Sequence, residues 1–230
     1  MPDITIHGPD GDFSAYLAMP SGGQGPGIIA IQEIFGVNAD MRAHCDRFAA
    51  MGYIAISPDL FWRQEPGIQI TDQSEAEWQQ AFKLYQGFDV DKGVEDLKAT
   101  LAHLRGVDGC NGKAGTVGFC LGGLLAYLMA CETDADCNVS YYGVGINEKL
   151  DLAKKITAPT ILHIAEEDEF VDTAAQDAIK KGLAGHPDVT CYSYPGVNHA
   201  FTRNNGVHYD EAAAKLAHDR TAAAFSAALR

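Results

Sequence analysis

One stretch of eight residues, 116–123, constrains the fold of this chain more than any other. It reads TVGFCLGG and predicts a short strand that ends in a sharp turn and passes at once into a helix. Cys120 stands at the turn in the pattern G-x-C-x-G, and its small neighbours would let strand and helix approach a strained position. The helix would also direct the positive end of its dipole at the sulfur. The alternative interpretation is a glycine-rich turn in an ordinary βα unit.

Strands and helices are expected to alternate along the rest of the chain. Apolar runs and turn residues predict a hairpin over residues 3–7 and 13–19 and strands over 28–31, 53–57, 114–117, 139–142, 160–165 and 189–194. Helical spacing and N-cap residues predict helices over 39–50, 74–105 with a break near 87–88, 147–154 (short), 173–184 and 210–229. Residues 106–112 are expected to form a loop. The alternation predicts an α/β fold with a mostly parallel, doubly wound sheet and helices on both faces. We expect a single domain over residues 1–230, with a lid-like excursion at about 59–90.

Composition narrows the range of partners. The chain of 230 residues has 31 acidic and 17 basic residues, a formal charge of −14, and its basic residues are scattered. Nucleic acid and membrane surfaces are therefore not expected as partners, and a monomer or small homo-oligomer is expected. Residues 1–7 lack a signal-peptide pattern, and no apolar run is long enough for a membrane span. Six cysteines in a chain of this size are expected to be reduced thiols, which favours the cytoplasm.

The strained turn would raise Cys120 as a nucleophile. A cysteine nucleophile needs a base, and the base needs an acid that orients it. His199 follows the predicted strand 189–194, and four carboxylates follow the strand 160–165, namely Glu166, Glu167, Asp168 and Glu169. Ligands bind beyond the carboxyl ends of strands in open α/β sheets, so both segments would lie at the edge of the sheet where a substrate binds. We expect His199 to be the base. A run of four carboxylates also suits a solvated surface, and the pattern alone does not choose among them.

Three further positions are expected near the nucleophile. Glu33 follows the strand 28–31 and would lie close to the thiol, where its charge would keep the resting cysteine neutral. The alternative is a solvated surface carboxylate. The backbone N–H groups of Leu121, next after the nucleophile, and of Ile34 are expected to form an oxyanion hole.

Taken together, these motifs resemble the dienelactone hydrolase family of the α/β-hydrolase superfamily, in the same order and over nearly the whole chain. The matching stretches are QEIFGVN at 32–38, SPDL at 57–60, GFCLGG at 118–123, Asp168 and HAF at 199–201. The resemblance implies a Cys120–His199–Asp168 triad, with Glu33 holding the thiol neutral until substrate displaces it. It also implies that an enol-lactone ester is opened through an acyl-cysteine, which water then hydrolyses. No metal or organic cofactor is implied.

The chain departs from the family pattern where a substrate carboxylate would bind. Family members that act on dienelactone are expected to grip its carboxylate with two arginines. Arg203 matches the second arginine, but Trp78 stands where the first is expected, and Ala200 replaces a small hydroxyl residue. Arg63 and Lys83 are the other cations near this segment. The pocket is therefore expected to favour a less polar ester, with an aromatic wall made of Phe35, Trp62, Trp78, Phe82 and Tyr85. Ordinary packing of a lid would explain the same aromatic residues.

Several functions remain compatible with these patterns. Hydrolysis of a small lactone or ester is the leading hypothesis. A ligand-binding protein with little turnover on the same scaffold, or a carboxylesterase or thioesterase of broad specificity, are the alternatives. A dinucleotide-dependent oxidoreductase is disfavoured because G-x-G-x-x-G does not follow the first buried strand.

Overall fold

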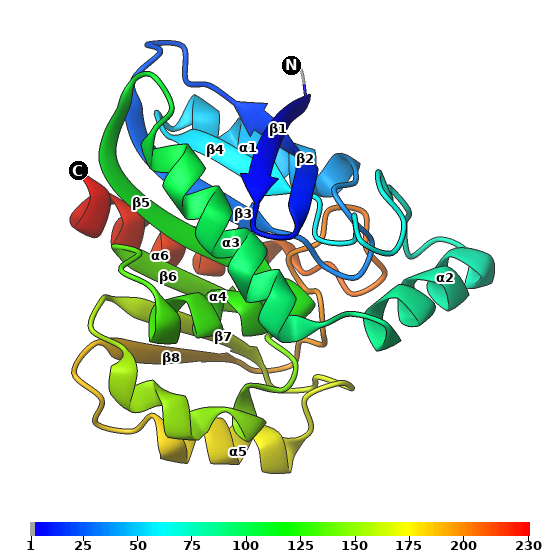
Figure 1. Ribbon diagram of the computed structural model, residues 1–230. Helices are drawn as coiled ribbons and strands as arrows, with labels where there is room; N and C mark the ends of the chain where they lie inside the picture. The colour runs from blue at the N-terminus through cyan, green and yellow to red at the C-terminus, as the bar shows by residue number, and fades with distance from the viewer. Residues whose placement is uncertain (1–2) are drawn as a thin grey trace. The chain divides into compact units, whose positions relative to one another are not determined.

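The computed structural model describes residues 3–230, which divide into two compact units, one ending at Thr116 and one running from Val117 to Arg230 (Figure 1). The elements of the first unit are β1 (Asp3–Gly8), β2 (Gly11–Ala18), β3 (Gly25–Ile31), α1 (Ala39–Ala50), β4 (Ile54–Pro58), α2 (Glu75–Gln86) and α3 (Val90–Arg105). Strand β5 (Cys110–Phe119) runs from the first unit into the second. The second unit continues with α4 (Leu121–Glu132), β6 (Cys137–Tyr141), the 3₁₀ segments η1 (Ile146–Glu148) and η2 (Leu150–Lys155), β7 (Thr160–Ala165), α5 (Thr173–Gly182), β8 (Val189–Tyr194) and α6 (Glu211–Leu229).

The first unit is a sheet covered by helices. The β1–β2 hairpin is antiparallel, β2 pairs antiparallel with β4, and β4 pairs parallel with β3. Helices α1 and α3 pack on these strands, α3 in front of them and α1 behind them in the view of Figure 1. Because both faces are covered, the apolar runs of β3 and β4 are buried without alternation. Helix α2 stands out from the other elements of this unit (Figure 1).

The second unit repeats this arrangement with parallel strands. Strand β6 pairs with β7, and β7 pairs with β8, all in parallel register. Helices α4 and α6 both pack on β6, and all five residues of that strand are buried. The carboxyl ends of β7 and β8 therefore lie at the same edge of the sheet, and the residues that follow both strands gather there.

The sequence predicted most of these elements within a few residues. The side chains of Asn38 and Ser74 cap α1 and α2, where they accept backbone hydrogen bonds from Met41 and Glu77 respectively. The predicted loop over residues 106–112 was wrong at its end, because β5 begins at Cys110. The first four residues of β5 are not buried, so no apolar pattern marks them as a strand. The short helix predicted near 147–154 is a pair of 3₁₀ segments.

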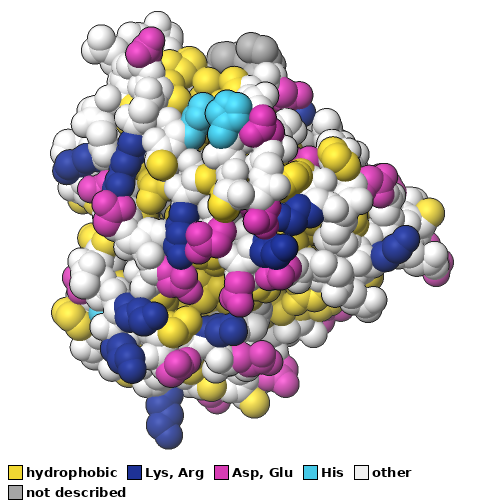
Figure 2. All heavy atoms as spheres, viewed as in Figure 1, with side chains coloured by type: hydrophobic (Ala, Val, Ile, Leu, Met, Phe, Trp, Pro, Cys, Tyr) yellow, Lys and Arg dark blue, Asp and Glu magenta, His cyan; other side chains and the backbone are white. Residues whose placement is uncertain are grey.

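The described residues contain no helix long and apolar enough to cross a membrane. All six cysteines are free thiols. On the face that Figure 2 shows, basic and acidic side chains are interspersed, and no large basic patch covers it.

Candidate active site

Cys120 occupies the turn between β5 and α4, and its backbone is strained. Its φ of 56° and ψ of −114° lie in a region that non-glycine residues rarely adopt. The backbone N–H of Cys120 donates to the carbonyl oxygen of Tyr141 at 3.1 Å, and the Cys120 carbonyl accepts from Gly123 at 2.9 Å. The half-buried Cys120 side chain is thus held at the N-terminus of α4, where the helix dipole favours a negative charge.

The glycines around Cys120 are required by close backbone contacts. A Cβ atom added at Gly118 would lie 1.8 Å from the carbonyl oxygen of Gly122. A Cβ atom added at Gly123 would lie 2.6 Å from the carbonyl oxygen of Tyr141. Because both obstacles are backbone atoms, a larger residue could fit only if the strand and the helix moved apart. The glycines therefore define the turn that carries the thiol.

Replacing Gly118 with alanine is expected to destabilise the protein severely, by at least about 3 kcal/mol, because the new methyl group overlaps backbone that cannot move aside. Gly22→Ala is the matched control, since nothing lies within 4 Å of a Cβ atom at Gly22. Urea denaturation of both variants measures the free energy of unfolding. Equal stability of the two variants would contradict this explanation of the turn.

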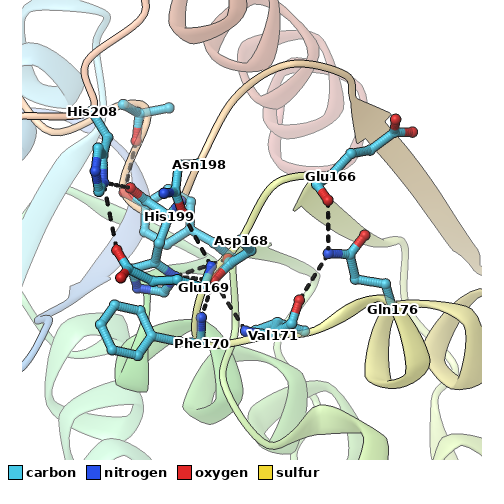
Figure 3. Close-up of polar contacts among 11 residues, drawn as sticks. Glu166, Asp168, Glu169, Phe170, Val171, Gln176, Asn198, His199 and His208 are labelled. Carbon is cyan, nitrogen blue, oxygen red and sulfur yellow. Dashed lines mark hydrogen bonds and ion pairs between the residues drawn. The ribbon is translucent and has the colours of Figure 1, made fainter.

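His199 and Asp168 lie side by side beyond the ends of β8 and β7 (Figure 3). The Nδ1 atom of His199 is 2.9 Å from Oδ2 and 3.0 Å from Oδ1 of Asp168. Asp168 Oδ1 also accepts the backbone N–H groups of Phe170 at 2.8 Å and Val171 at 3.1 Å. Both members of the pair are buried. The carboxylate is therefore fixed in place and fixes the imidazole in turn.

The structure distinguishes among the four consecutive carboxylates. Asp168 is buried against His199, whereas Glu166, Glu167 and Glu169 are exposed. The side chain that the family resemblance favoured is thus the one that the fold brings to the histidine.

Cys120 and Asp168 both act on the protonation of His199. Burial lowers the pKa of His199, but the negative charge of a Cys120 thiolate and the hydrogen bond to Asp168 outweigh it and raise that pKa to about 10. Nε2 is buried and makes no hydrogen bond within the part of the chain that the structure describes. A histidine with Nδ1 held by a carboxylate and Nε2 left open can accept or deliver a proton at Nε2.

Two aromatic rings that no motif marked contact His199. The Tyr142 ring centre is 4.9 Å and the Phe170 ring centre 4.8 Å from that of the imidazole, both in edge-to-face arrangements. Tyr142 has a φ of 39°, which is strained for an aromatic residue, and its hydroxyl is 2.9 Å from Thr202 Oγ1. Phe170 comes two residues after the acid, and Tyr142 comes directly after β6, so position beyond a strand end was the only available signal.

The other predicted site residues, apart from Leu121 and Arg203, belong to the first unit. Glu33 and Ile34 are buried just after β3. The Trp78 ring stacks on Phe82 with centres 5.4 Å apart and meets Phe35 edge to face at 5.1 Å. Tyr85, on the same helix, is half-buried. These contacts define an aromatic cluster of Phe35, Trp78 and Phe82, and the part of all these residues in a site with Cys120 stays a prediction.

Trp62, which was expected in the aromatic wall, and Arg63, a cation expected near it, contact other residues of the first unit. The Trp62 ring stacks on Phe13 at 5.7 Å, and its Nε1 donates to Asp96 at 2.9 Å. Arg63 forms ion pairs with Asp96 and with Asp10. The guanidinium of Arg63 is therefore neutralised by two carboxylates and is poorly suited to bind a substrate anion.

Leu121 and Arg203 lie in the second unit with Cys120, Asp168 and His199. Leu121 is the first residue of α4, so its backbone N–H has no partner within the helix and can be offered to an anion. Arg203 is 9% exposed, and its backbone N–H donates to Ala200 at 2.9 Å. Among residues 3–230, no group of three or more histidine, cysteine or acidic side chains is arranged to hold a metal ion.

Comparison with known proteins first defines the class. The structure superposes on the crystal structure of a provisionally named dienelactone hydrolase from Klebsiella pneumoniae subsp. pneumoniae with a TM-score of 0.85. The match covers 98% of this chain and 97% of that one, at 26% sequence identity. The fold is that of an α/β hydrolase, which confirms the predicted fold class.

Sequence comparison then gives the family. The model of the dienelactone hydrolase family matches residues 13–229, so the chain belongs to that family and the resemblance is confirmed. A provisionally named carboxymethylenebutenolidase of Azospirillum brasilense is 49% identical over 232 residues, covering 98% of each chain. The carboxymethylenebutenolidase of Pseudomonas putida is 38% identical over 218 residues, covering 94% of this chain and 92% of that protein.

Proposed function

We propose that this chain hydrolyses a small lactone or ester through an acyl intermediate on Cys120, with His199 as base and Asp168 as its orienting acid. The proposal rests on the His199 imidazole. Its Nδ1 is held by a buried carboxylate, while its buried Nε2 makes no hydrogen bond within the described residues. The influence of Cys120 on the pKa of His199 supports the same assignment. The relatives named carboxymethylenebutenolidases support a lactone as the substrate class.

In the proposed first half-reaction, the Cys120 thiolate attacks the carbonyl carbon of the ester. The carbonyl π electrons move to oxygen, and the backbone N–H of Leu121 at the start of α4 stabilises the resulting oxyanion. When the tetrahedral intermediate collapses, the C–O bond of the ester breaks. The imidazolium of His199 delivers its Nε2 proton to the departing oxygen, which leaves an acyl-cysteine and a neutral histidine.

In the second half-reaction, neutral His199 takes a proton from water as the water oxygen attacks the acyl-cysteine. Collapse of this second tetrahedral intermediate breaks the C–S bond and releases the carboxylic acid. The thiolate and the imidazolium are thereby restored. Asp168 stays ionised throughout and keeps the Nδ1 proton on its own side of the ring, so that Nε2 faces the reaction.

Glu33 and Ile34 take part in this proposal through the family resemblance. Glu33 would keep the thiol neutral in the resting enzyme. When substrate displaces Glu33, the thiol proton would pass to Nε2 of His199 and the thiolate would form, and Ile34 would supply a second oxyanion donor. A charged Cys120 contributes to the raised pKa of His199, so the thiolate–imidazolium pair belongs to the state after Glu33 is displaced. The two descriptions then apply to successive states of one catalytic cycle.

An activated aryl ester tests whether the chain is a hydrolase or a binding protein. We expect p-nitrophenyl acetate to release about one nitrophenolate per chain in a burst, followed by slower steady turnover, because deacylation follows a separate acylation step. Acid quenching and mass spectrometry should find the acetyl group on Cys120. Absence of turnover would favour the ligand-binding alternative, and turnover with the acyl group on another residue would contradict the assignment of the nucleophile.

The substrate is proposed to be less polar than dienelactone, because Trp78 stands where the first of two carboxylate-binding arginines is expected. One charge-assisted contact fewer weakens carboxylate binding by about ten- to hundredfold. We expect kcat/KM for a neutral lactone to exceed that for its carboxylated analogue, and Trp78→Arg to raise the acid-to-neutral ratio. Trp78→Phe is the control, since it keeps an aromatic ring beside Phe35 and Phe82. A wild-type preference for the acid would contradict the proposal.

The compartment is proposed to be the cytoplasm. Six free thiols, one of them proposed as the nucleophile, suit a reducing environment. The proposed partner is the small-molecule substrate, and the oligomeric state is left as a monomer or small homo-oligomer.

A further inference from the structure

The backbone N–H and the backbone carbonyl of His199 are both bound by side chains outside the triad. The backbone N–H of His199 donates to Asn198 Oδ1 at 2.6 Å. The backbone carbonyl of His199 accepts from Nδ1 of His208 at 3.2 Å. A carbonyl oxygen cannot donate, so the Nδ1 atom of His208 carries a proton in this bond. Figure 3 shows the three residues together beside Asp168.

The same two side chains also reach the segment that carries the acid. Asn198 Oδ1 accepts the backbone N–H of Glu169 at 3.1 Å. His208 Nδ1 lies 4.0 Å from Oε1 of Glu169, at the outer limit of an ion pair. Glu169 directly follows Asp168, so Asn198 and His208 connect the loop after β7 with the loop after β8 (Figure 3).

The backbone just after His199 needs such restraint. Ala200 has a φ of 61°, a left-handed conformation that costs a non-glycine residue free energy. If the peptide before Ala200 were free to rotate, this strain could relax by turning the His199 side chain away from Asp168. Such strained residues persist only where surrounding contacts fix them.

We propose that His208 and Asn198 are positioning residues, which clamp the His199 peptide so that its ring stays aligned between Asp168 and Cys120. This inference rests on the proposed function only for its kinetic consequences. The clamp acts on the backbone of His199 and is present in the enzyme without substrate.

Three variants separate the hydrogen bond of His208 from its bulk. His208→Leu removes the donor, whereas His208→Asn keeps an N–H at nearly the position of Nδ1. His186→Leu is the matched control, because His186 also contacts a backbone carbonyl, that of Ala153 at 3.1 Å, and is likewise half-buried. We expect kcat to fall about two- to tenfold in His208→Leu with KM nearly unchanged, and to stay within about twofold of wild type in the other two variants.

A proton NMR measurement without substrate tests the clamp independently of catalysis. The Nδ1 proton of His199, shared with Asp168, is expected as a downfield resonance that broadens in His208→Leu and sharpens again in His208→Asn. If the resonance responds while no variant has hydrolytic activity, the clamp stands and the proposed function fails. If kcat and the resonance are unchanged in His208→Leu, if His208→Asn is as impaired as His208→Leu, or if His186→Leu is equally impaired, the clamp is overturned.

Discussion

Replacing Cys120 with alanine is expected to leave a folded protein whose kcat/KM for an ester falls by at least about a thousandfold. The nucleophile is lost, while the main-chain oxyanion donor and the binding contacts remain. Cys120→Ser is expected to be nearly as weak, because a hydroxyl is far less acidic than a thiol and needs more help from a base. Steady-state kinetics measure the loss, and circular dichroism checks that both variants are folded.

Four of the other five cysteines are poor candidates for the nucleophile. Burial raises the pKa of Cys131 and Cys191 to about 11 and that of Cys137 to about 12, and it raises the pKa of Cys45 further. These thiols are therefore protonated at neutral pH and react slowly with alkylating reagents.

Cys110 is the informative competitor among the thiols, because it is only half-buried. Iodoacetamide added during turnover, when the proposed mechanism makes Cys120 a thiolate, is expected to abolish activity in Cys110→Ser as fast as in the wild type, with one label, on Cys120. Inactivation that tracks labelling of any other cysteine would contradict the assignment of the nucleophile.

The sequence predicted well the strand ends and the turn that carry the candidate site residues, for a physical reason. The turn at Cys120 and the loops after β7 and β8 follow directly from apolar runs bounded by glycine, proline and polar residues. The local rules of strand ends and helix starts therefore placed Cys120, Asp168 and His199 at element boundaries. The fold then brings Asp168 and His199 together.

The contacts between loops could not be predicted from the sequence. Asn198, His208 and Glu169 belong to irregular segments, so no periodicity relates them, and their hydrogen bonds exist only after β7 and β8 have paired. Tyr142 and Phe170 likewise meet His199 through tertiary packing. Trp62 belongs to the same sequence segment as Trp78, but its ring stacks on Phe13 and its Nε1 donates a hydrogen bond to Asp96. Sequence proximity did not reveal these contacts.

Removing the His199–Asp168 pair is the second change with a large expected effect. His199→Ala should lower kcat by at least about a thousandfold, because both proton transfers are lost. Asp168→Asn should cost roughly a hundred- to ten-thousandfold, since an amide can turn its N–H₂ toward Nδ1 and force the proton onto Nε2. Glu167→Gln is the control and should stay within about twofold, because Glu167 is exposed. If Asp168→Asn keeps full activity while Glu167→Gln loses it, Glu167 rather than Asp168 orients His199.

The same pair fixes the sign of the pH dependence. With Cys120 as a thiolate, the charge of Cys120 and the hydrogen bond to Asp168 outweigh burial and raise the pKa of His199 to about 10. In that state the imidazolium stabilises the fold fully below the unfolded value near 6.5, and this stabilisation is lost as the pH rises through about 10. With Cys120 neutral, only Asp168 raises the pKa, so the stabilisation is lost at a lower pH. Asp168→Asn should lower the pKa, because burial then acts with less opposition. An NMR titration of the ring measures this shift, and an unchanged pKa in Asp168→Asn would contradict the account.

The titration also decides the part proposed for Glu33. If the resting Cys120 is already a thiolate, Cys120→Ala must lower the pKa of His199, because the charge of Cys120 is the largest contribution that raises it. If Glu33 holds the thiol neutral, Cys120→Ala should leave the pKa of the free enzyme unchanged, and Glu33→Gln should raise it by letting the thiolate form. We expect the second pattern, since it leaves the nucleophile inactive until substrate arrives. The first pattern would remove Glu33 from the mechanism while leaving the triad intact.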